Sequence, residues 1–329
     1  MQRQSIAARR VTAALFLFAA APTLAMAASF PTRPVRVVVP FAPGGASDFV
    51  GRILQPRLAA ELGQSVVIDN RSGAAGNIGV EVAASASPDG HTLLLGNVGT
   101  MAINPSLYPK FRYQPLRDLV PITQVVDVPG SLVVHPSVPA QTVKELVDLL
   151  RSRPGQFNFA SSGAGSANRL EMELFMRATG TQLTHVPFKG GAGPAVASLL
   201  GGETHVAFLT LSSTTTFVKQ GRLRLLGVVS ASRVAAVADT PTLPESGFAD
   251  MRIGSWQGMF APRGTPQPVL DRLFTVTRAA ARHADSVERL SASGVLSVTS
   301  DSSQAFRAFV QSEIDRYGKV IRAAGITAD

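Results

Sequence analysis

The loop formed by residues 40–48 most constrains the fold, because it joins an apolar run to a helical pattern through a pair of glycines. Residues 35–39 have the composition of a buried strand, and a helix opens near Phe49. A loop that leaves such a strand and enters a helix presents backbone N–H groups at the positive end of the helix dipole, where an anion can bind. The sequence therefore predicts an α/β unit with a site for an acidic small molecule.

A second loop of this kind spans residues 160–166. It follows the strand-like residues 157–159 and precedes a helix that starts near Asn168. Ligand-binding loops lie at the carboxyl ends of strands in α/β proteins. Two such loops, far apart in the sequence, therefore predict two lobes that hold one ligand between them.

Apolar runs and helical patterns alternate along the whole chain, which is typical of α/β proteins with parallel sheets. We predict two lobes, each a doubly wound and mostly parallel sheet with flanking helices. The first lobe comprises residues 28–128 and 235–329, and the second comprises residues 129–234. Residues 240–254 are expected to lead back into the first lobe, and a terminal helix over residues 303–324 is expected to pack on it.

The N-terminus has the pattern of an export signal. The first ten residues contain three arginines and no acid, residues 11–21 are apolar, and residues 25–27 form an Ala-x-Ala cleavage site. A membrane anchor is the alternative, but the apolar run is shorter than the roughly 20 residues that span a bilayer. We therefore predict a signal peptide over residues 1–27 that is removed on export.

The amino-acid composition limits the cellular compartment and the classes of partner that we expect. The chain has no cysteine, which excludes disulfides, thiolate metal sites and a lipidated cysteine at the cleavage site. The expected location is the periplasm. The formal charge of +9 includes the three leader arginines, so the mature chain keeps a mild positive excess that suits anionic ligands. The basic residues are scattered and only one Trp and three Tyr are present, which argues against nucleic-acid binding.

No familiar catalytic or cofactor motif is found. The five histidines include no pair at i and i+4, and the sequence has no His-Glu-x-x-His, Gly-x-Ser-x-Gly or Walker motif. Gly163 and Gly165 begin a dinucleotide fingerprint, but Asn168 stands where its third glycine belongs. We therefore expect no enzyme, no cofactor and no metal. The alternative is an exported hydrolase of small esters with Ser161 or Ser162 as nucleophile, for which the sequence offers no evident base.

Seven motifs appear in a fixed order along the mature chain, and together they resemble the Bug family, the periplasmic receptors of tripartite tricarboxylate transporters. The resemblance covers essentially the whole mature length. The motifs are Val-Pro-Phe-Ala-Pro-Gly-Gly at 39–45, Asp-Asn-Arg-Ser-Gly-Ala-Ala-Gly-Asn-Ile-Gly at 69–79, Pro-Asp-Gly at 88–90, Asn-Pro-Ser-Leu-Tyr at 104–108, Ala-Ser-Ser-Gly at 160–163, His-Val-Pro-Phe-Lys-Gly at 185–190 and Ala-Ala-Gly-Ile at 323–326.

The resemblance implies a two-lobed periplasmic binding protein of the type II-like class. Such a monomeric receptor closes on a small carboxylate, which backbone amides and ordered water contact, and serves the membrane subunits of a tripartite tricarboxylate transporter or a sensor protein. Carried over by position, the ligand-binding residues are Phe41, Gly44, Gly45, Ala46, Ser47, Asp48, Thr100, Asn104, Ser161, Ser162, Gly165, Ser166 and Asn168. The alternatives are structural: Asp48 caps a helix, and the glycines turn the chain.

The sequence departs from the family at positions that bear on the ligand. His205 and Leu209 stand where relatives often carry acidic residues, and neither Leu209 nor Thr210 supplies an anion for an ammonium group. A plain carboxylate is therefore favoured over an amino acid. Arg169 stands in place of a histidine and either pairs with a carboxylate or faces solvent. Lys189 likewise either pairs with a carboxylate or faces solvent. The glycines at 73–79 are expected to serve close packing of strand and helix.

Overall fold

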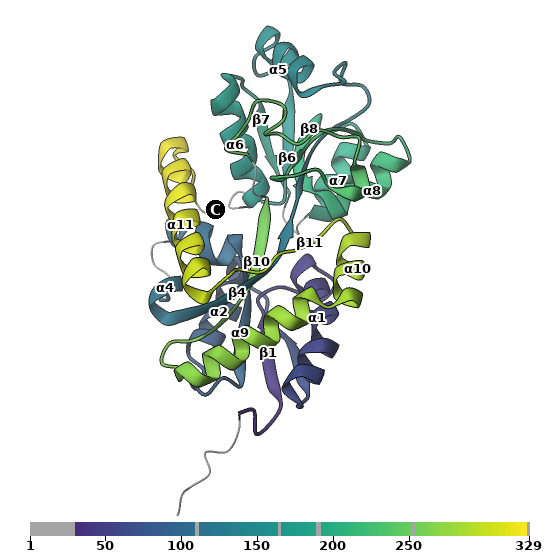
Figure 1. Cartoon of the computed structure of the whole chain (residues 1–329). Helices are drawn as coiled ribbons and strands as arrows, with labels where there is room; N and C mark the ends of the chain where they lie inside the picture. The colour runs from purple at the N-terminus through teal and green to yellow at the C-terminus, as the bar shows by residue number, and fades with distance from the viewer. Residues whose placement is uncertain (1–29, 109–111, 164–165, 189–191, 252–253, 328–329) are drawn as a thin grey trace, which may run out of the picture.

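The computed structural model describes residues 30–108, 112–163, 166–188, 192–251 and 254–327. These residues form two α/β lobes, each built on its own sheet, with the first lobe at the bottom of Figure 1 and the second at the top. The two-lobed α/β class expected from the sequence is confirmed. The predicted signal peptide at residues 1–27 lies outside the described residues.

The first sheet has six strands in the order β11-β4-β10-β3-β1-β2. β1 pairs in parallel with β2 and β3, whereas β10 pairs antiparallel with β3 and β4, and β11 antiparallel with β4. The strands are β1 (Val35–Val39), β2 (Val66–Asn70), β3 (Thr92–Asn97), β4 (Leu119–Val128), β10 (Ser255–Pro262) and β11 (Leu296–Ser297).

The second sheet has five strands in the order β7-β6-β8-β5-β9. β6 pairs in parallel with β7 and β8, and β5 pairs antiparallel with β8 and β9. The strands are β5 (Gly130–Val134), β6 (Asn158–Ser161), β7 (Thr184–Pro187), β8 (Val206–Thr210) and β9 (Arg224–Val229).

Both sheets are mixed, which corrects the expectation of mostly parallel sheets. The antiparallel pairs involve the strands that connect the lobes: β5 enters the second lobe directly after β4 through Pro129, and β10 returns to the first lobe between β3 and β4. A parallel neighbour requires a long crossover connection. Neither β5 nor β10 is reached through a crossover within its own sheet, so each runs opposite to its neighbours.

Helices cover both faces of the first sheet. α1 and α9 bury Leu54, Leu273 and Val276 against one face, and α2 and α11 pack against the other face with Val80 and Phe306. The helical elements of this lobe are α1 (Ala46–Leu62), η1 (Ala74–Gly76), α2 (Asn77–Ala84), η2 (Gly99–Ile103), α3 (Asn104–Leu107), α4 (Pro115–Asp118), α9 (Gln267–Arg282), α10 (Ala284–Ala292) and α11 (Ser303–Ala324).

The second sheet is covered in the same way. α5 and α6 bury Leu146 and Phe175 against one face, and α7 and α8 place Leu199 and Phe217 against the other. The helical elements are α5 (Val143–Ser152), α6 (Ala167–Thr179), α7 (Ala192–Leu200), α8 (Leu211–Lys219) and η3 (Ala235–Val237).

The segment that follows η3 stays with the second lobe further than expected. Leu243, Phe248 and Met251 pack in the same apolar cluster as Phe208 of β8, and the backbone at Thr242 bridges to β9. Burial of these apolar side chains keeps residues 242–251 on the second sheet, so the expected return from residue 240 is too early. The boundary of the two lobes at 128/129 stays a prediction, and the packing of residues 242–251 on the second sheet argues against the one at 234/235.

The terminal helix α11 packs on the first lobe as expected, and it also reaches the second lobe. Phe306, Val310 and Tyr317 lie in the core beneath it, and Leu170 of α6 joins this same cluster. The guanidinium of Arg177 on α6 donates to the carbonyl of Ala323 near the end of α11. The helix therefore runs along one side of both lobes, as Figure 1 shows in yellow. No helix in the described part of the chain is long and apolar enough to cross a membrane.

Candidate ligand-binding site

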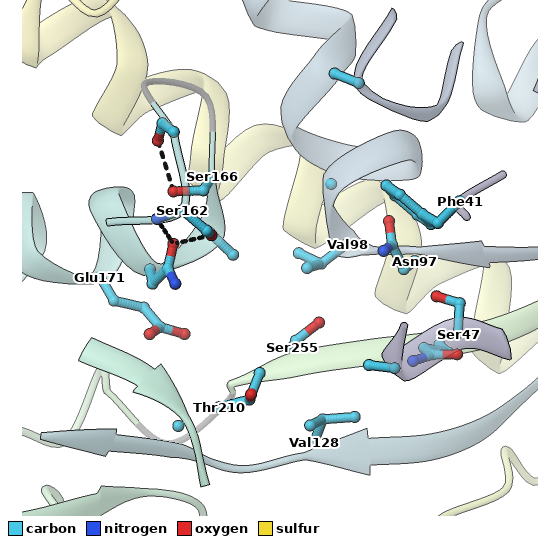
Figure 2. A pocket seen from close by; sticks show the side chains of 18 of the residues that line it. Phe41, Ser47, Asn97, Val98, Val128, Ser162, Ser166, Glu171, Thr210 and Ser255 are labelled. Carbon is cyan, nitrogen blue, oxygen red and sulfur yellow. Dashed lines mark hydrogen bonds between the residues drawn. The ribbon is translucent and has the colours of Figure 1, made fainter. Parts of the chain in front are cut away.

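A cleft of about 580 Å³ lies between the two lobes, within the range of small-molecule sites. Figure 2 shows its two walls, with Ser162 and Ser166 on one side and Phe41, Asn97 and Ser47 on the other. The cleft is lined by Phe41, Ala46, Ser47, Ala75, Asn97, Val98, Gly99, Asn104, Tyr108, Val128, Gly130, Ser162, Gly163, Ser166, Ala167, Asn168, Glu171, Leu209, Thr210, Ser255 and Gln257.

The loop after β1 contributes Phe41, Ala46 and Ser47 to the cleft. Gly45 is the N-cap of α1, so the first backbone N–H groups of a 17-residue helix open toward this wall. The carbonyl of Phe41 accepts a hydrogen bond of 3.0 Å from Asn70 Nδ2, which holds the loop against the end of β2. This wall therefore offers helix-end donors on a rigid support.

Asp48 holds this loop from inside rather than lining the cleft. It is 3% exposed, and its Oδ2 accepts hydrogen bonds of 2.9 Å from the Gly44 N–H and from Arg52 Nε. The bond from Arg52, together with the one from Gly44, lowers the pKa of the Asp48 carboxyl below its ordinary value. Gly44 has φ +81°, whereas Gly45 has φ −79°. The backbone conformation that favours glycine therefore occurs at Gly44 and not at Gly45.

The rest of the first wall is a network of amides behind β3. The N–H of Thr100 donates to Asn97 Oδ1 at 3.0 Å, and the Asn97 N–H donates to Thr100 Oγ1 at 3.1 Å, which fixes Asn97 at the cleft. Asn104 Nδ2 donates to Asn77 Oδ1 at 2.8 Å and to the carbonyl of Ala75 at 3.0 Å. Thr100 is thus a supporting residue, while Asn97 and Asn104 face the cleft.

The loop after β6 forms the opposite wall. Ser166 is the N-cap of α6, where its Oγ accepts from the Arg169 N–H at 3.4 Å and donates to the Gly163 carbonyl at 2.7 Å. Ser162 Oγ donates to Asn168 Oδ1 at 2.9 Å. Figure 2 draws the bonds of Ser166 to Gly163 and of Ser162 to Asn168 as dashed lines, and they hold the loop against its own helix. Two helix N-termini, one from each lobe, thus open on the same cleft.

Seven of the thirteen expected ligand-binding residues line the cleft: Phe41, Ala46, Ser47, Asn104, Ser162, Ser166 and Asn168. Five others are not among the lining residues, namely Gly44, Gly45, Asp48, Thr100 and Ser161; of these, Asp48, Thr100 and Ser161 form hydrogen bonds within the loops beside the cleft. Gly165 lies outside the described residues, as does Lys189.

Sequence comparison gives the family. Residues 50–326 match the family described as "Tripartite tricarboxylate transporter family receptor". The protein BugT of Bordetella pertussis is 35% identical over 320 residues, which is 96% of this chain and 98% of BugT. This chain belongs to the tripartite tricarboxylate transporter receptor family.

Solved structures agree with this assignment. The periplasmic binding protein BugD is 34% identical and superposes with a TM-score of 0.77, covering 91% of this receptor and all of BugD. A protein of R. palustris, solved with adipate, is 35% identical with a TM-score of 0.80 over 91% of this chain and 100% of that one. MatC of Rhodopseudomonas palustris, solved with bound malate, is 33% identical with a TM-score of 0.76 over 89% and 100%.

Members of this receptor family are periplasmic solute-binding proteins and not enzymes. The geometry around the serine alternative is consistent with that. Ser161 Oγ lies 2.6 Å from Nε2 of His185, a base that the sequence alone did not reveal. However, Ser161 is fully buried, does not line the cleft, and its hydroxyl donates to the Gly163 carbonyl at 3.0 Å. In this receptor the pair braces the loop after β6.

Charged side chains are scarce in the receptor's cleft. Among the described lining residues there is no Lys, Arg or His, and the one carboxyl belongs to Glu171. Arg169, an expected candidate for a carboxylate partner, does not line the cleft, and its Nε lies 3.7 Å from Glu173 Oε1 one turn further along α6. The described residues contain no group of three or more His, Cys, Asp or Glu side chains that could hold a metal ion.

The sequence did not point to several lining residues. Glu171 follows the serine loop by one helical turn, whereas Ser255 and Gln257 belong to β10, more than 80 residues further along the chain. No glycine or serine loop marks these positions, and only their place at the cleft reveals them. Leu209, a position at which the sequence departs from relatives, and Thr210 next to it both line the cleft.

Proposed function

We propose that this receptor binds a small carboxylate in the cleft between its lobes and delivers it, in the periplasm, to the membrane subunits of a tripartite tricarboxylate-type uptake system. A sensor protein is the other partner that such a receptor serves. The proposal includes export through a cleaved leader over residues 1–27 and a monomeric receptor.

The observation that carries the proposal is the meeting of two helix N-termini at one cleft. α1 begins at Ala46, and Ala46 and Ser47 line the cleft. α6 begins directly after its N-cap Ser166, and Ser166 and Ser162 line the opposite wall. Each terminus presents unpaired backbone N–H groups and the positive end of a helix dipole, which favour a carboxylate without a cationic side chain. The scarcity of Lys and Arg among the described lining residues fits recognition by backbone donors.

The structures of relatives support the same ligand class. Adipate and malate, named for two of the solved relatives, are both small dicarboxylates. A dicarboxylate has an anionic group at each end, and the cleft has one helix N-terminus on each wall. We therefore propose that the two carboxylates of one ligand, or a carboxylate and a hydroxyl, face the two loops.

A thermal-shift panel of citrate, malate, succinate, adipate, nicotinate, benzoate, aspartate and glutamate tests the proposal. A ligand that binds the folded protein raises the melting temperature in step with the logarithm of its concentration above the dissociation constant. We expect one or more of the plain carboxylates to do so, with calorimetry giving one site per chain. The proposal is refuted if no carboxylate stabilises the protein or if the bound compound is consumed.

A further inference from the structure

Glu171 is a buried carboxyl group that faces the ligand cleft. It lies in α6, one turn after the N-terminus, and is 5% exposed. It lines the cleft together with Thr210 and Ser255, and Figure 2 shows its side chain extending toward the part of the cleft where these two residues lie. A bound ligand that fills the cleft would therefore meet this carboxyl group.

The carboxyl group of Glu171 has no ionic partner of its own. Within the described ranges of the chain it forms no hydrogen bond and no ion pair. Its Oε2 lies beside the backbone of Gly130, where an added Cβ would be 3.3 Å away. Glycine at this position leaves room for the carboxyl group between α6 and the strand that enters the second lobe.

The charged and titratable groups around Glu171 come from two elements besides its own. α11 supplies Arg316, Glu313 and Tyr317, and β4 supplies Asp127. Arg316 is already engaged, because its Nε and a terminal nitrogen donate to the Glu313 carboxylate at 2.9 and 3.1 Å. The negative charge of Glu313 thus offsets the positive charge of Arg316. Within the part of the chain that the structure describes, Glu171 and Asp127 therefore have no cation that pairs with either of them alone.

Burial is the main reason why the charged form of Glu171 is disfavoured. It raises the pKa of this carboxyl to about 8, and the nearby Asp127 acts in the same direction while Arg316 opposes both. Burial also raises the pKa of Asp127, to about 7, with the Glu313 charge adding to the effect. An anionic ligand in the cleft would disfavour a second negative charge still further.

We propose that Glu171 is a specificity residue that carries a proton in the bound complex and donates its O–H to an acceptor oxygen of the ligand. This inference rests on the proposed carboxylate-binding function and deepens it. The preferred substrates are then acids with a second acceptor group, such as dicarboxylates and hydroxy acids. Amino acids are disfavoured, since a neutral Glu171 supplies no anion to pair with an ammonium group and a desolvated, unpaired charge is costly.

A single substitution can distinguish a protonated Glu171 from an ionised one. Glutamine presents an amide N–H donor in nearly the same volume, so Glu171→Gln mimics the neutral acid but not the carboxylate. Glu173→Gln is the matched control, because Glu173 lies in the same helix, pairs with Arg169 and does not line the cleft.

The first measurement needs no ligand. Carbon NMR of the labelled protein, with the Glu171 carboxyl resonance assigned by its loss in Glu171→Gln, should give a titration midpoint near pH 8. A midpoint near the ordinary glutamate value of about 4.3 would overturn the inference.

The second measurement is calorimetry with malate and with aspartate, which carries an ammonium in place of the malate hydroxyl. If another dicarboxylate stabilises the protein better than malate does, it is used in place of malate. For the wild type and Glu173→Gln, Kd should rise about tenfold between pH 6.5 and pH 9, because only the protonated fraction binds. Glu171→Gln should lose this rise, so that its Kd is the same at pH 6.5 and at pH 9. Aspartate should bind far more weakly than malate to all three proteins.

Two results would overturn the inference while leaving the receptor function intact. One is the same pH dependence of carboxylate binding in wild type and Glu171→Gln. The other is tight aspartate binding that Glu171→Gln abolishes, which would assign an ionised Glu171 to an ammonium. If no carboxylate binds at any pH, the proposed function itself fails, and donation by Glu171 to such a ligand fails with it.

Discussion

The hydroxyl of Ser162 donates a hydrogen bond of 2.9 Å to Asn168 Oδ1, and this bond ties the loop after β6 to the first turn of α6. Both residues line the cleft. The bond uses the one proton of the hydroxyl and holds the described part of the loop against the start of its own helix. Loop shape in this receptor is thus set by side chains that themselves stand at the proposed ligand site.

Replacement of Asn168 by alanine should weaken carboxylate binding by about 1 kcal/mol, or about fivefold in Kd, because a loop that loses this bond must be ordered by the ligand instead. Calorimetry checks the affinity. Asn158→Ala is the control: Asn158 begins β6, bonds to His205 and does not line the cleft, so its loss should change stability and leave Kd unaltered. Equal Kd in wild type and Asn168→Ala would contradict the role of the bond.

Replacement of Asp48 by alanine should destabilise the protein at pH 7 by roughly 1–2 kcal/mol, since the Gly44 N–H and Arg52 lose the buried carboxylate that accepts their hydrogen bonds. The pKa of Asp48 is lowered in the folded state. Its contribution is therefore complete above the unfolded pKa of about 3.9 and is lost as the pH falls below that value.

Urea unfolding of wild type and Asp48→Ala at pH 7, 5 and 3 measures this difference. The gap between the two proteins should be constant from pH 7 to 5 and shrink by pH 3. Asp271→Ala, at an exposed position on α9, should show no comparable gap. A gap that is unchanged at pH 3 would mean that the charge of Asp48 does not matter.

The two glycines of the first loop should respond differently to alanine. Gly44 has φ +81°, which costs an alanine about 1–2 kcal/mol. Gly45 has φ −79°, and a Cβ there would lie 3.4 Å from the Ala42 carbonyl, an ordinary contact. Urea unfolding should therefore find Gly44→Ala destabilised and Gly45→Ala close to wild type. The reverse order would show that the loop adopts another conformation.

Gly79 should tolerate no side chain. A Cβ at this position would lie 2.6 Å from Pro40 Cα and 2.8 Å from the Arg71 carbonyl, so the backbone would have to move. We expect Gly79→Ala to destabilise the protein by about 1–3 kcal/mol, as overpacking does. Gly193→Ala is the contrast, because a Cβ in this helix would meet nothing within 4 Å. A neutral Gly79→Ala in thermal unfolding would contradict the close packing of α2 on the first strand.

Ser161→Ala should cost about 1 kcal/mol of stability through the lost hydroxyl bonds and should leave ester hydrolysis at the level of buffer for both proteins. A spectrophotometric assay with p-nitrophenyl acetate checks the second point. Hydrolysis by wild type that disappears in Ser161→Ala would revive the pairing of Ser161 with His185 as a catalytic one.

The sequence patterns predicted those parts of the fold that depend on residues close together in the chain. The apolar run at residues 35–39 is β1, and the glycine pair after it opens α1. The glycines at residues 73–79 were expected to serve close packing, which the contacts of Gly79 confirm. Periodic apolar residues predicted α11 and its packing on the first lobe.

Local patterns failed where one strand or helix meets another from a distant part of the chain. The local sequence does not distinguish Glu171 from an ordinary exposed helical residue. Its burial depends on the strand that contains Gly130 and on α11. In the same way, the pairing of Ser161 with His185 depends on the register of β6 with β7.

The sequence by itself determined the α/β class, the two loops at strand ends and the family, because each depends on residue types at short spacing. The tertiary structure alone decided that β10 returns between β3 and β4, which brings Ser255 and Gln257 to the cleft. It also decided that α11 lies along both lobes and places an already paired Arg316 near Glu171. The physical reason is that burial and charge at a site are sums over neighbours from the whole chain, which no short stretch of sequence contains.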